Sequence, residues 1–187
     1  ERIQGLRIFC EYRDQRSFPL LLPLLDQPCP VERMSAVYAL GRNPCPSAVQ
    51  KLVSLLKTDD NAYVRRATAW SLANYENQIV LEPLINALKN DVAAVRLWSS
   101  SSLAEIGNVS MENAQLAAEQ LLISLKIDNE SGVRSNCIWS LCRLYEKLST
   151  TFQESFVDEC TKIALFDKEP SVMAVSYTHL TLPTTYH

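Results

Sequence analysis

Cysteine is the residue type of this chain that could support metal-binding or redox chemistry. Six cysteines are spread along the 187 residues, at Cys10, Cys29, Cys45, Cys137, Cys142 and Cys160. Cys29 and Cys45 flank one expected helix and would lie roughly 18 Å apart at 1.5 Å per residue, whereas a zinc ion needs Zn–S distances of about 2.3 Å. No CxxC motif occurs. We therefore expect reduced structural thiols and no metal site, with a thiol-based metal or cluster carrier as a secondary alternative.

Histidine chemistry depends on the last residues of the chain. Both histidines, His179 and His187, lie in the segment 175–187. This segment reads as the translation of a transposase adapter from sequencing libraries, so we expect it to be non-native and outside the fold of residues 1–174. Residues 1–174 offer no Ser/His/Asp or Cys/His arrangement and no glycine-rich phosphate loop. A catalytic function is therefore less expected than a binding function.

Arginine recurs at a regular interval and could bind an anion. It stands at positions 2, 33, 65, 96 and 134, in steps of 31, 32, 31 and 38 residues. Asp60 and Asp91 each precede the next of these arginines by five residues, and so does Asn129. These are good N-cap types for the helix that follows. The fixed offset favours a structural ladder in which each arginine binds an acidic residue or a loop carbonyl between repeats, formed by Arg33, Arg65, Arg96 and Arg134.

Two kinds of helix are needed to place these arginines. Between the arginine-bearing segments lies a second apolar stripe, for example Leu81, Leu84, Ile85 and Leu88, which share one face of a helix. A helix pair repeated every ~31 to 38 residues must stack on its neighbours to bury its apolar faces. The sequence therefore predicts an all-α fold, a right-handed α-α superhelix. We expect a lone helix at about residues 2–12, four full helix pairs and a truncated fifth repeat.

The arginine-bearing helix is expected to line the concave side of the solenoid. On a helical wheel its core side is formed by Val64, Ala67, Thr68, Ser71 and Leu72, and small residues lie opposite. An inner wall that is small, apolar and edged by aromatic residues suits a partner helix or a flat apolar ligand. The alternative is that the aromatic residues only pack one repeat on the next. The candidate binding residues are Met34, Val37, Tyr38, Arg66, Trp70, Ile138 and Trp139.

Composition limits the classes of partner. The net charge is −3, which argues against nucleic acid and against an anionic membrane surface. No apolar run reaches the ~18 residues that a membrane span needs. The chain begins Glu1-Arg2-Ile3, which is not a signal peptide and suggests truncation. We expect a cytoplasmic location and another protein as the partner.

Three segments share a residue pattern: 60–67 followed by Trp70-Ser71-Leu72, 91–96, and Val133-Arg134 leading to Trp139-Ser140-Leu141. They resemble HEAT-like repeats of the phycobilisome-lyase type found in cyanobacterial proteins. The resemblance covers roughly residues 1–174. It implies a HEAT-like or armadillo-like solenoid that acts as a scaffold. As an alternative it implies a relative of the E/F-type lyases, which attach a bilin chromophore to phycobiliproteins. A bilin would be the only cofactor, and only under that alternative.

Overall fold

The computed structural model describes residues 5, 8–9 and 11–181. Within these residues every regular element is a helix. The α-helices are α2 (Phe18–Leu21), α3 (Pro30–Arg42), α4 (Val49–Thr58), α5 (Ala62–Leu72), α6 (Leu81–Asn90), α7 (Ala93–Gly107), α8 (Met111–Ile127), α9 (Ser131–Leu144), α10 (Thr150–Phe166) and α11 (Pro170–Thr181). The short 3₁₀ helices are Gln15–Ser17, Leu22–Asp26, Pro46–Ala48, Gln78–Val80 and Tyr145–Lys147. The predicted all-α solenoid is therefore confirmed.

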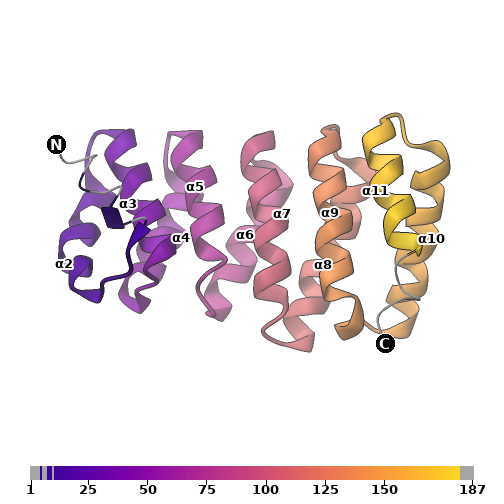
Figure 1. Cartoon of the computed structure of the whole chain (residues 1–187), viewed down its shortest axis with the longest axis horizontal. Coiled ribbons are helices and arrows are strands. Elements are labelled where there is room, and N and C mark those ends of the chain that lie inside the picture. The colour runs from indigo at the N-terminus through magenta and orange to yellow at the C-terminus, as the bar shows by residue number, and fades with distance from the viewer. Residues whose placement is uncertain (1–4, 6–7, 10, 182–187) are drawn as a thin grey trace.

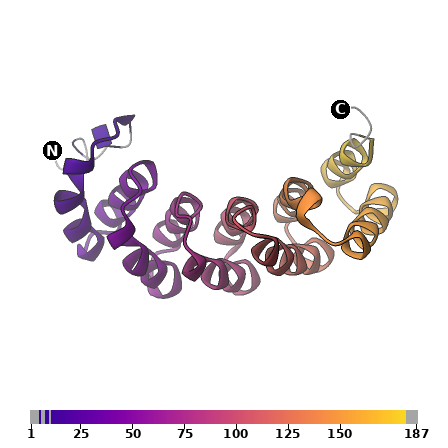
Figure 2. The same ribbon diagram turned by 90° about the horizontal axis from the view of Figure 1, so that it is seen from below.

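The helices form two rows (Figure 1). Helices α3, α5, α7, α9 and α11 stand side by side in one row, and α4, α6, α8 and α10 form the row behind it. The stack is curved, and Figure 2 shows the α3–α11 row on the concave side. We call α3, α5, α7, α9 and α11 the inner helices, and α4, α6, α8 and α10 the outer helices.

The apolar stripes account for the packing of the outer helices. In α6, Leu84 is fully buried, and Leu81, Ile85 and Leu88 are at most 7% exposed. Fully burying a leucine side chain stabilises a fold by about 1.5–3 kcal/mol relative to leaving it in water. Each outer helix therefore anchors its repeat by laying one stripe against the inner row.

Close approach holds the inner helices to one another. Ser102 Oγ of α7 donates to the carbonyl of Ala69 in α5 at 2.8 Å, and Ser140 Oγ of α9 donates to the carbonyl of Ser100 in α7 at 2.8 Å. Such bonds to a backbone carbonyl of a neighbouring helix need small side chains at the contact. The serines and alanines of the inner helices thus serve repeat-to-repeat packing rather than an open groove.

The two ends of the fold relate differently to the expected boundaries. The predicted lone helix at 2–12 falls largely on residues outside the described ones. At the other end the fifth inner helix, α11, runs through Thr181, beyond the predicted boundary at residue 174. Ser176 is fully buried and Val175 packs against the core. The start of the segment 175–187 is therefore part of the packed structure, because its residues continue the helix that Pro170 begins. No helix among the described residues is both long and apolar enough to cross a membrane.

Candidate binding surface

The four arginines at the predicted ladder positions make the same set of contacts. Nε and Nη2 of each guanidinium donate to both carboxylate oxygens of one aspartate, at 2.7–3.0 Å. Nη1 donates to a carbonyl in the loop before its own helix, at 2.7–2.9 Å. The pairs are Arg33–Asp59, Arg65–Asp91, Arg96–Asp128 and Arg134–Asp167. Since each aspartate belongs to the following repeat, these arginines tie adjacent repeats together.

The position of the aspartates explains this geometry. Asp59, Asp91, Asp128 and Asp167 each follow the last residue of an outer helix. The carboxylate also accepts a nearby backbone N–H, as Asp59 does from Asn61 at 2.9 Å. The aspartate side chains are 3–12% exposed and the arginine side chains 11–19%. A bidentate pair with this little exposure is stronger than an ordinary surface ion pair.

Burial and hydrogen bonding act in opposite directions on these carboxylates. Burial by itself raises the pKa of Asp91, but the hydrogen bonds from Arg65 and from the Val92 N–H outweigh burial and lower it. The same causes lower the pKa of Asp59, Asp128 and Asp167. All four carboxylates are therefore held in the ionised form that the arginines bind.

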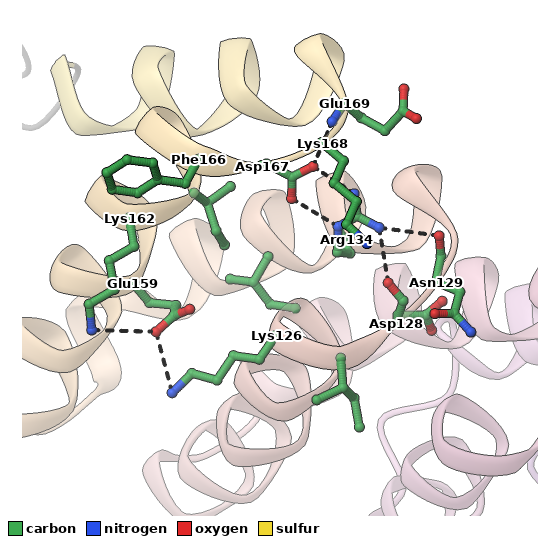
Figure 3. A pocket seen from close by; sticks show the side chains of 13 residues that line it. Lys126, Asp128, Asn129, Arg134, Glu159, Lys162, Phe166, Asp167, Lys168 and Glu169 are labelled. Atoms are coloured by element: carbon green, nitrogen blue, oxygen red, sulfur yellow. Dashed lines mark hydrogen bonds and ion pairs between the residues drawn. The ribbon is translucent and has the colours of Figure 1, made fainter.

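Figure 3 shows the last rung of the ladder, where Arg134 reaches Asp167 and the loop carbonyls of Asp128 and Asn129. Beside it lies a hollow of about 420 Å³ between α8 and α10, where Lys126 lies 3.5 Å from Glu159. Similar hollows of about 340 Å³ occur beside Arg65 and Arg96. These hollows repeat with the ladder, so they follow from the stacking of the outer helices.

Of the two aspartates that the sequence offered for this ladder, Asp91 is a partner and Asp60 is not. Asp60 is exposed, and its neighbour Asp59 takes the contact with Arg33. Asp91 does not cap the helix that follows it; its carboxylate binds Arg65 of the preceding repeat. The N-cap that accepts backbone N–H groups at the start of α5 is Asn61. A shift of one residue in the loop decides which aspartate faces the arginine of the neighbouring repeat. The spacing of the repeats does not reveal this shift.

At the N-terminal end of the concave side, Trp70 lies in a cluster of aromatic and arginine side chains. Its ring centroid is 5.3 Å from that of Tyr38, and the Arg42 guanidinium carbon lies 5.4 Å from the centroid of the Trp70 ring. A Cβ on Gly41 would come within 2.5 Å of Trp70 Cζ3, so the ring covers this glycine directly. Trp70 therefore packs α5 on α3 and leaves only part of its ring accessible.

Arg66 extends this cluster. Its guanidinium carbon lies 5.5 Å from the ring centroid of Tyr63, and its Nη2 donates to the Tyr38 hydroxyl at 3.4 Å. Its Nε is buried and has no partner within the described part of the chain. Tyr63 itself is 64% exposed. The cluster thus presents arginine and aromatic groups together to the concave side.

Trp139 occupies the same place in α9 that Trp70 has in α5, five residues after the ladder arginine, but its surroundings differ. It is 38% exposed, and the Arg143 guanidinium carbon lies 5.0 Å from its ring centroid. Arg143 is paired with Glu105 of α7 at 2.9 Å. Trp139 also borders a hollow of about 390 Å³, lined by Ser101, Gly132, Ser135, Asn136, Trp139 and Val175.

The predicted binding residues separate into two groups. Met34, Tyr38, Arg66, Trp70 and Trp139 keep accessible surface on the inner helices. Val37 and Ile138 are fully buried and cannot contact a partner. The correction follows from packing, because a position on the flank of one inner helix is covered by the next inner helix. A wheel drawn for a single helix does not include that neighbour.

Sequence reasoning also missed accessible aromatic and arginine residues of the inner helices. Trp98 of α7 is 37% exposed, but it lies one turn before the expected aromatic position, which Ser101 occupies. Tyr63, Arg42 and Arg143 were missed because they lie near the ends of their helices. Their spacing could have revealed them, because residues three or four positions apart lie on the same side of a helix: Tyr63 precedes Arg66 by three, and Arg42 and Arg143 follow Tyr38 and Trp139 by four. We define the inner wall as the residues Tyr38, Arg42, Tyr63, Arg66, Trp70, Trp98, Trp139 and Arg143.

The cysteines lie mostly in the packed interior. Cys137 is fully buried and Cys160 is 2% exposed, while Cys29 is exposed. Burial raises the pKa of the Cys142 and Cys160 thiols to about 12, and it raises the pKa of Cys137 as well. No group of three or more potential metal ligands occurs in the residues that the structure describes. Protonated interior thiols are poor nucleophiles and poor metal ligands.

Comparison with known proteins relates this architecture to helical repeat proteins. The complex of CpcE and CpcF of phycocyanin lyase from Nostoc sp. PCC7120 aligns with a TM-score of 0.67 at 21% identity, over 89% of this chain and 99% of that chain. An engineered protein from a structural genomics consortium aligns with a TM-score of 0.66 at 20% identity, over 95% of this chain and 90% of that chain. A designed armadillo repeat protein aligns with a TM-score of 0.62 at 18% identity, again over 95% of this chain and 90% of that chain. At these identities the likeness shows the fold alone.

A search of curated proteins found no match to this chain. The family model for HEAT repeats matches residues 1–73 and 49–142. These ranges include all four ladder arginines and every inner-wall residue except Arg143. The chain therefore belongs to the HEAT repeat family.

Proposed function

We propose that this chain is a protein-binding scaffold that docks a partner on its inner wall. The observation that carries the proposal is the row of large aromatic side chains left accessible on successive inner helices: Tyr63 at 64%, Trp98 at 37% and Trp139 at 38% exposure. Tryptophan and tyrosine are the residue types most enriched at binding hot spots. The concave side of a solenoid provides an extended surface for such contacts.

The experiment compares inner-wall variants with a matched outer variant. The immobilised full chain is used to capture proteins from a lysate, and the captured set is quantified by mass spectrometry. Trp98→Ala and Trp139→Ala should each weaken capture of the same protein by about 2 kcal/mol in affinity, the size typical of a hot spot. Ile127→Ala, which removes an apolar side chain that is 72% exposed on outer helix α8, is the control and should leave capture unchanged. Equal effects of all three variants would contradict docking on the inner wall.

A second candidate is a role in handling a bilin chromophore. It is supported by the likeness of the fold to the phycocyanin lyase complex and by the hollow beside Trp139. Its volume of about 390 Å³ lies in the range of small-molecule sites. Mixing the chain with a free bilin should then shift the bilin absorbance to the red, and Trp139→Ala should reduce the shift. An unchanged spectrum would leave protein docking as the function.

The buried thiols give little support to a metal or cluster carrier. Cys137 and Cys160 would have to leave the core and lose their protons before they could bind a metal. Such a carrier would retain metal through purification and lose it on Cys→Ser substitution.

A further inference from the structure

The inner helices have an unusual charge composition. Their charged residues comprise seven arginines, two glutamates, and neither lysine nor aspartate within Pro30–Arg42, Ala62–Leu72, Ala93–Gly107, Ser131–Leu144 and Pro170–Thr181. The arginines are Arg33, Arg42, Arg65, Arg66, Arg96, Arg134 and Arg143. Four of them are neutralised by the aspartates of the ladder. Arg143 is neutralised by Glu105. Two arginines, Arg42 and Arg66, remain without a carboxylate partner among the described residues.

The second glutamate does not compensate these two arginines. Glu32 precedes the ladder residue Arg33, the same place that Val64, Val95 and Val133 hold in the following inner helices. Those valines are at most 2% exposed and belong to the interior. Glu32 thus lies on the side of α3 that faces away from the inner wall. The chain as a whole carries a net charge of −3, so the N-terminal part of the inner wall has a local charge opposite to that of the whole molecule.

Aromatic rings hold both of the uncompensated guanidinium groups. Arg42 lies over the Trp70 ring at 5.4 Å and Arg66 over the Tyr63 ring at 5.5 Å. A ring face orients a guanidinium group without neutralising its charge or using its N–H donors. Arg66 uses one donor for the Tyr38 hydroxyl, and its other N–H groups have no partner in the described structure. Oriented arginines with free donors are suited to bidentate binding of carboxylates.

We propose that the partner docked at the N-terminal end of the inner wall is a peptide segment bearing aspartate or glutamate, whose carboxylates bind Arg42 and Arg66. This inference rests on the proposed function, because it names the chemistry of the docked partner. The apolar and aromatic residues of that segment lie against Tyr38, Tyr63 and Trp70. The match is one of charge: the site supplies two uncompensated cations, and the segment supplies the carboxylates that the inner helices lack.

Single-stranded nucleic acid is the other ligand class that uses arginine and aromatic side chains together. The inner wall does not favour it. Binding the phosphate backbone of a nucleic-acid strand needs a continuous positive groove. The described inner wall has two uncompensated arginines, and Arg143 at its other end is paired with Glu105. Carboxylates spaced along a short peptide require no more than these two cations.

Random twelve-residue peptides displayed on phage provide the probe, selected against the immobilised full chain. Peptides recovered on the wild-type chain should be enriched in Asp and Glu. The best of them, made synthetically, should bind at least tenfold more weakly to Arg42→Gln and to the double variant Arg42→Gln/Arg66→Gln. Binding should also weaken as salt rises. The matched control is Lys162→Gln, which removes an exposed cation of outer helix α10 that is already paired with Asp158, and it should change affinity by less than about threefold. Circular dichroism checks that each variant is folded.

The outcomes separate this inference from the proposed function. Peptides without acidic enrichment, whose binding is lost in Trp98→Ala or Trp139→Ala but kept in Arg42→Gln, would overturn the acidic partner and leave inner-wall docking intact. Recovery of no peptide above background would overturn both. Tighter binding of an oligothymidine strand than of the acidic peptide would replace the peptide by nucleic acid. If the double variant fails to fold, Arg42→Gln alone decides, because Arg42 is exposed and its guanidinium makes no hydrogen bond among the described contacts.

Discussion

The ladder and the inner wall lie on the same helices but differ in how far they repeat. The ladder repeats one contact from α3 to α9, with the same atoms and nearly the same distances. The inner wall changes from helix to helix: the position five residues after the ladder arginine holds Tyr38, Trp70, Ser101 and Trp139 in turn. A contact that every repeat needs for stacking is the same in every repeat. Accessible positions that differ between repeats are therefore the better candidates for recognition.

Arg65→Ala should produce a large loss of stability and tests the ladder most directly. It removes two hydrogen bonds to Asp91 and one to the Asp59 carbonyl, and it leaves a poorly exposed carboxylate without its cationic partner. We expect the free energy of unfolding to fall by about 3 kcal/mol. Urea denaturation followed by circular dichroism measures this loss. The control Arg42→Ala, on the exposed inner wall, should cost under about 1 kcal/mol, and similar losses for both arginines would erase the distinction between the two regions.

Gly41→Ala should be the next largest effect and tests whether Trp70 is a packing residue. The new Cβ would lie 2.5 Å from Trp70 Cζ3 and 3.0 Å from Ser71 Oγ, so the ring has to move. Overpacking of this kind costs about 1–3 kcal/mol. The check is a double-mutant cycle with Trp70→Ala: without the ring, the cost of Gly41→Ala should shrink to a fraction of its value. An unchanged cost in the Trp70→Ala background would mean that the ring does not rest on this glycine.

Acid should weaken the ladder and leave the contacts between aromatic rings and arginines on the inner wall unaffected. The folded-state pKa of each ladder aspartate is lowered from its ordinary value of 3.8. A lowered pKa contributes stability that is complete above the unfolded-state value and is lost as pH falls through the folded-state value. We therefore expect this contribution to be constant from pH 7 to about 5 and to decline below about 4. Unfolding free energy measured against pH should fall less steeply below pH 4 in Asp91→Asn than in the wild type, and parallel curves would show that Asp91 does not take part.

Trp139→Ala should have the smallest effect on stability. Trp139 is 38% exposed, and Ala104 of α7 stands where Gly41 stands in α3, so no glycine lies beneath its ring. We expect a loss of about 1 kcal/mol, mainly its contact with Arg143. Trp70→Ala should cost about 3 kcal/mol, because much of that ring is buried against α3. Thermal unfolding of the two variants measures the difference in stability loss. A larger loss for Trp139→Ala than for Trp70→Ala would mean that Trp139 is the packing residue and Trp70 the accessible one.

A feature of the fold or of the ladder was predictable from the sequence when it depends on one helix alone. The buried stripe of Leu81, Leu84, Ile85 and Leu88 follows from helical periodicity, which needs no knowledge of neighbours. The spacing of the ladder arginines was visible because the residue type itself recurs. Asp91 could be named as an acidic partner from its offset, but Asp59 could not, since the choice of Asp59 over Asp60 depends on how the loop leaves α4.

The composition of the inner wall was less predictable than the fold for the same reason. Val37 and Ile138 are hidden by the adjacent inner helix, which a single-helix wheel omits. The different environments of Trp70 and Trp139 depend on the residue that the preceding inner helix places beneath each ring. Neither fact can be read from the segment that contains the tryptophan.

The ladder of arginine–aspartate pairs ends before α3 and at α11, where other residue types stand at its positions. Gln27 holds the loop position before Arg33 that Asp59 holds before Arg65, and Met173 of α11 follows Val172 as Arg65 follows Val64. The repeats between them are bonded to a neighbour on both sides, whereas the first and last are bonded on one side only. In a stack stabilised by nearest-neighbour contacts, opening then begins at the ends and moves inward one repeat at a time. Backbone amides of α5 and α7 should thus exchange with solvent more slowly than those of α11, where Met173 stands at the ladder position.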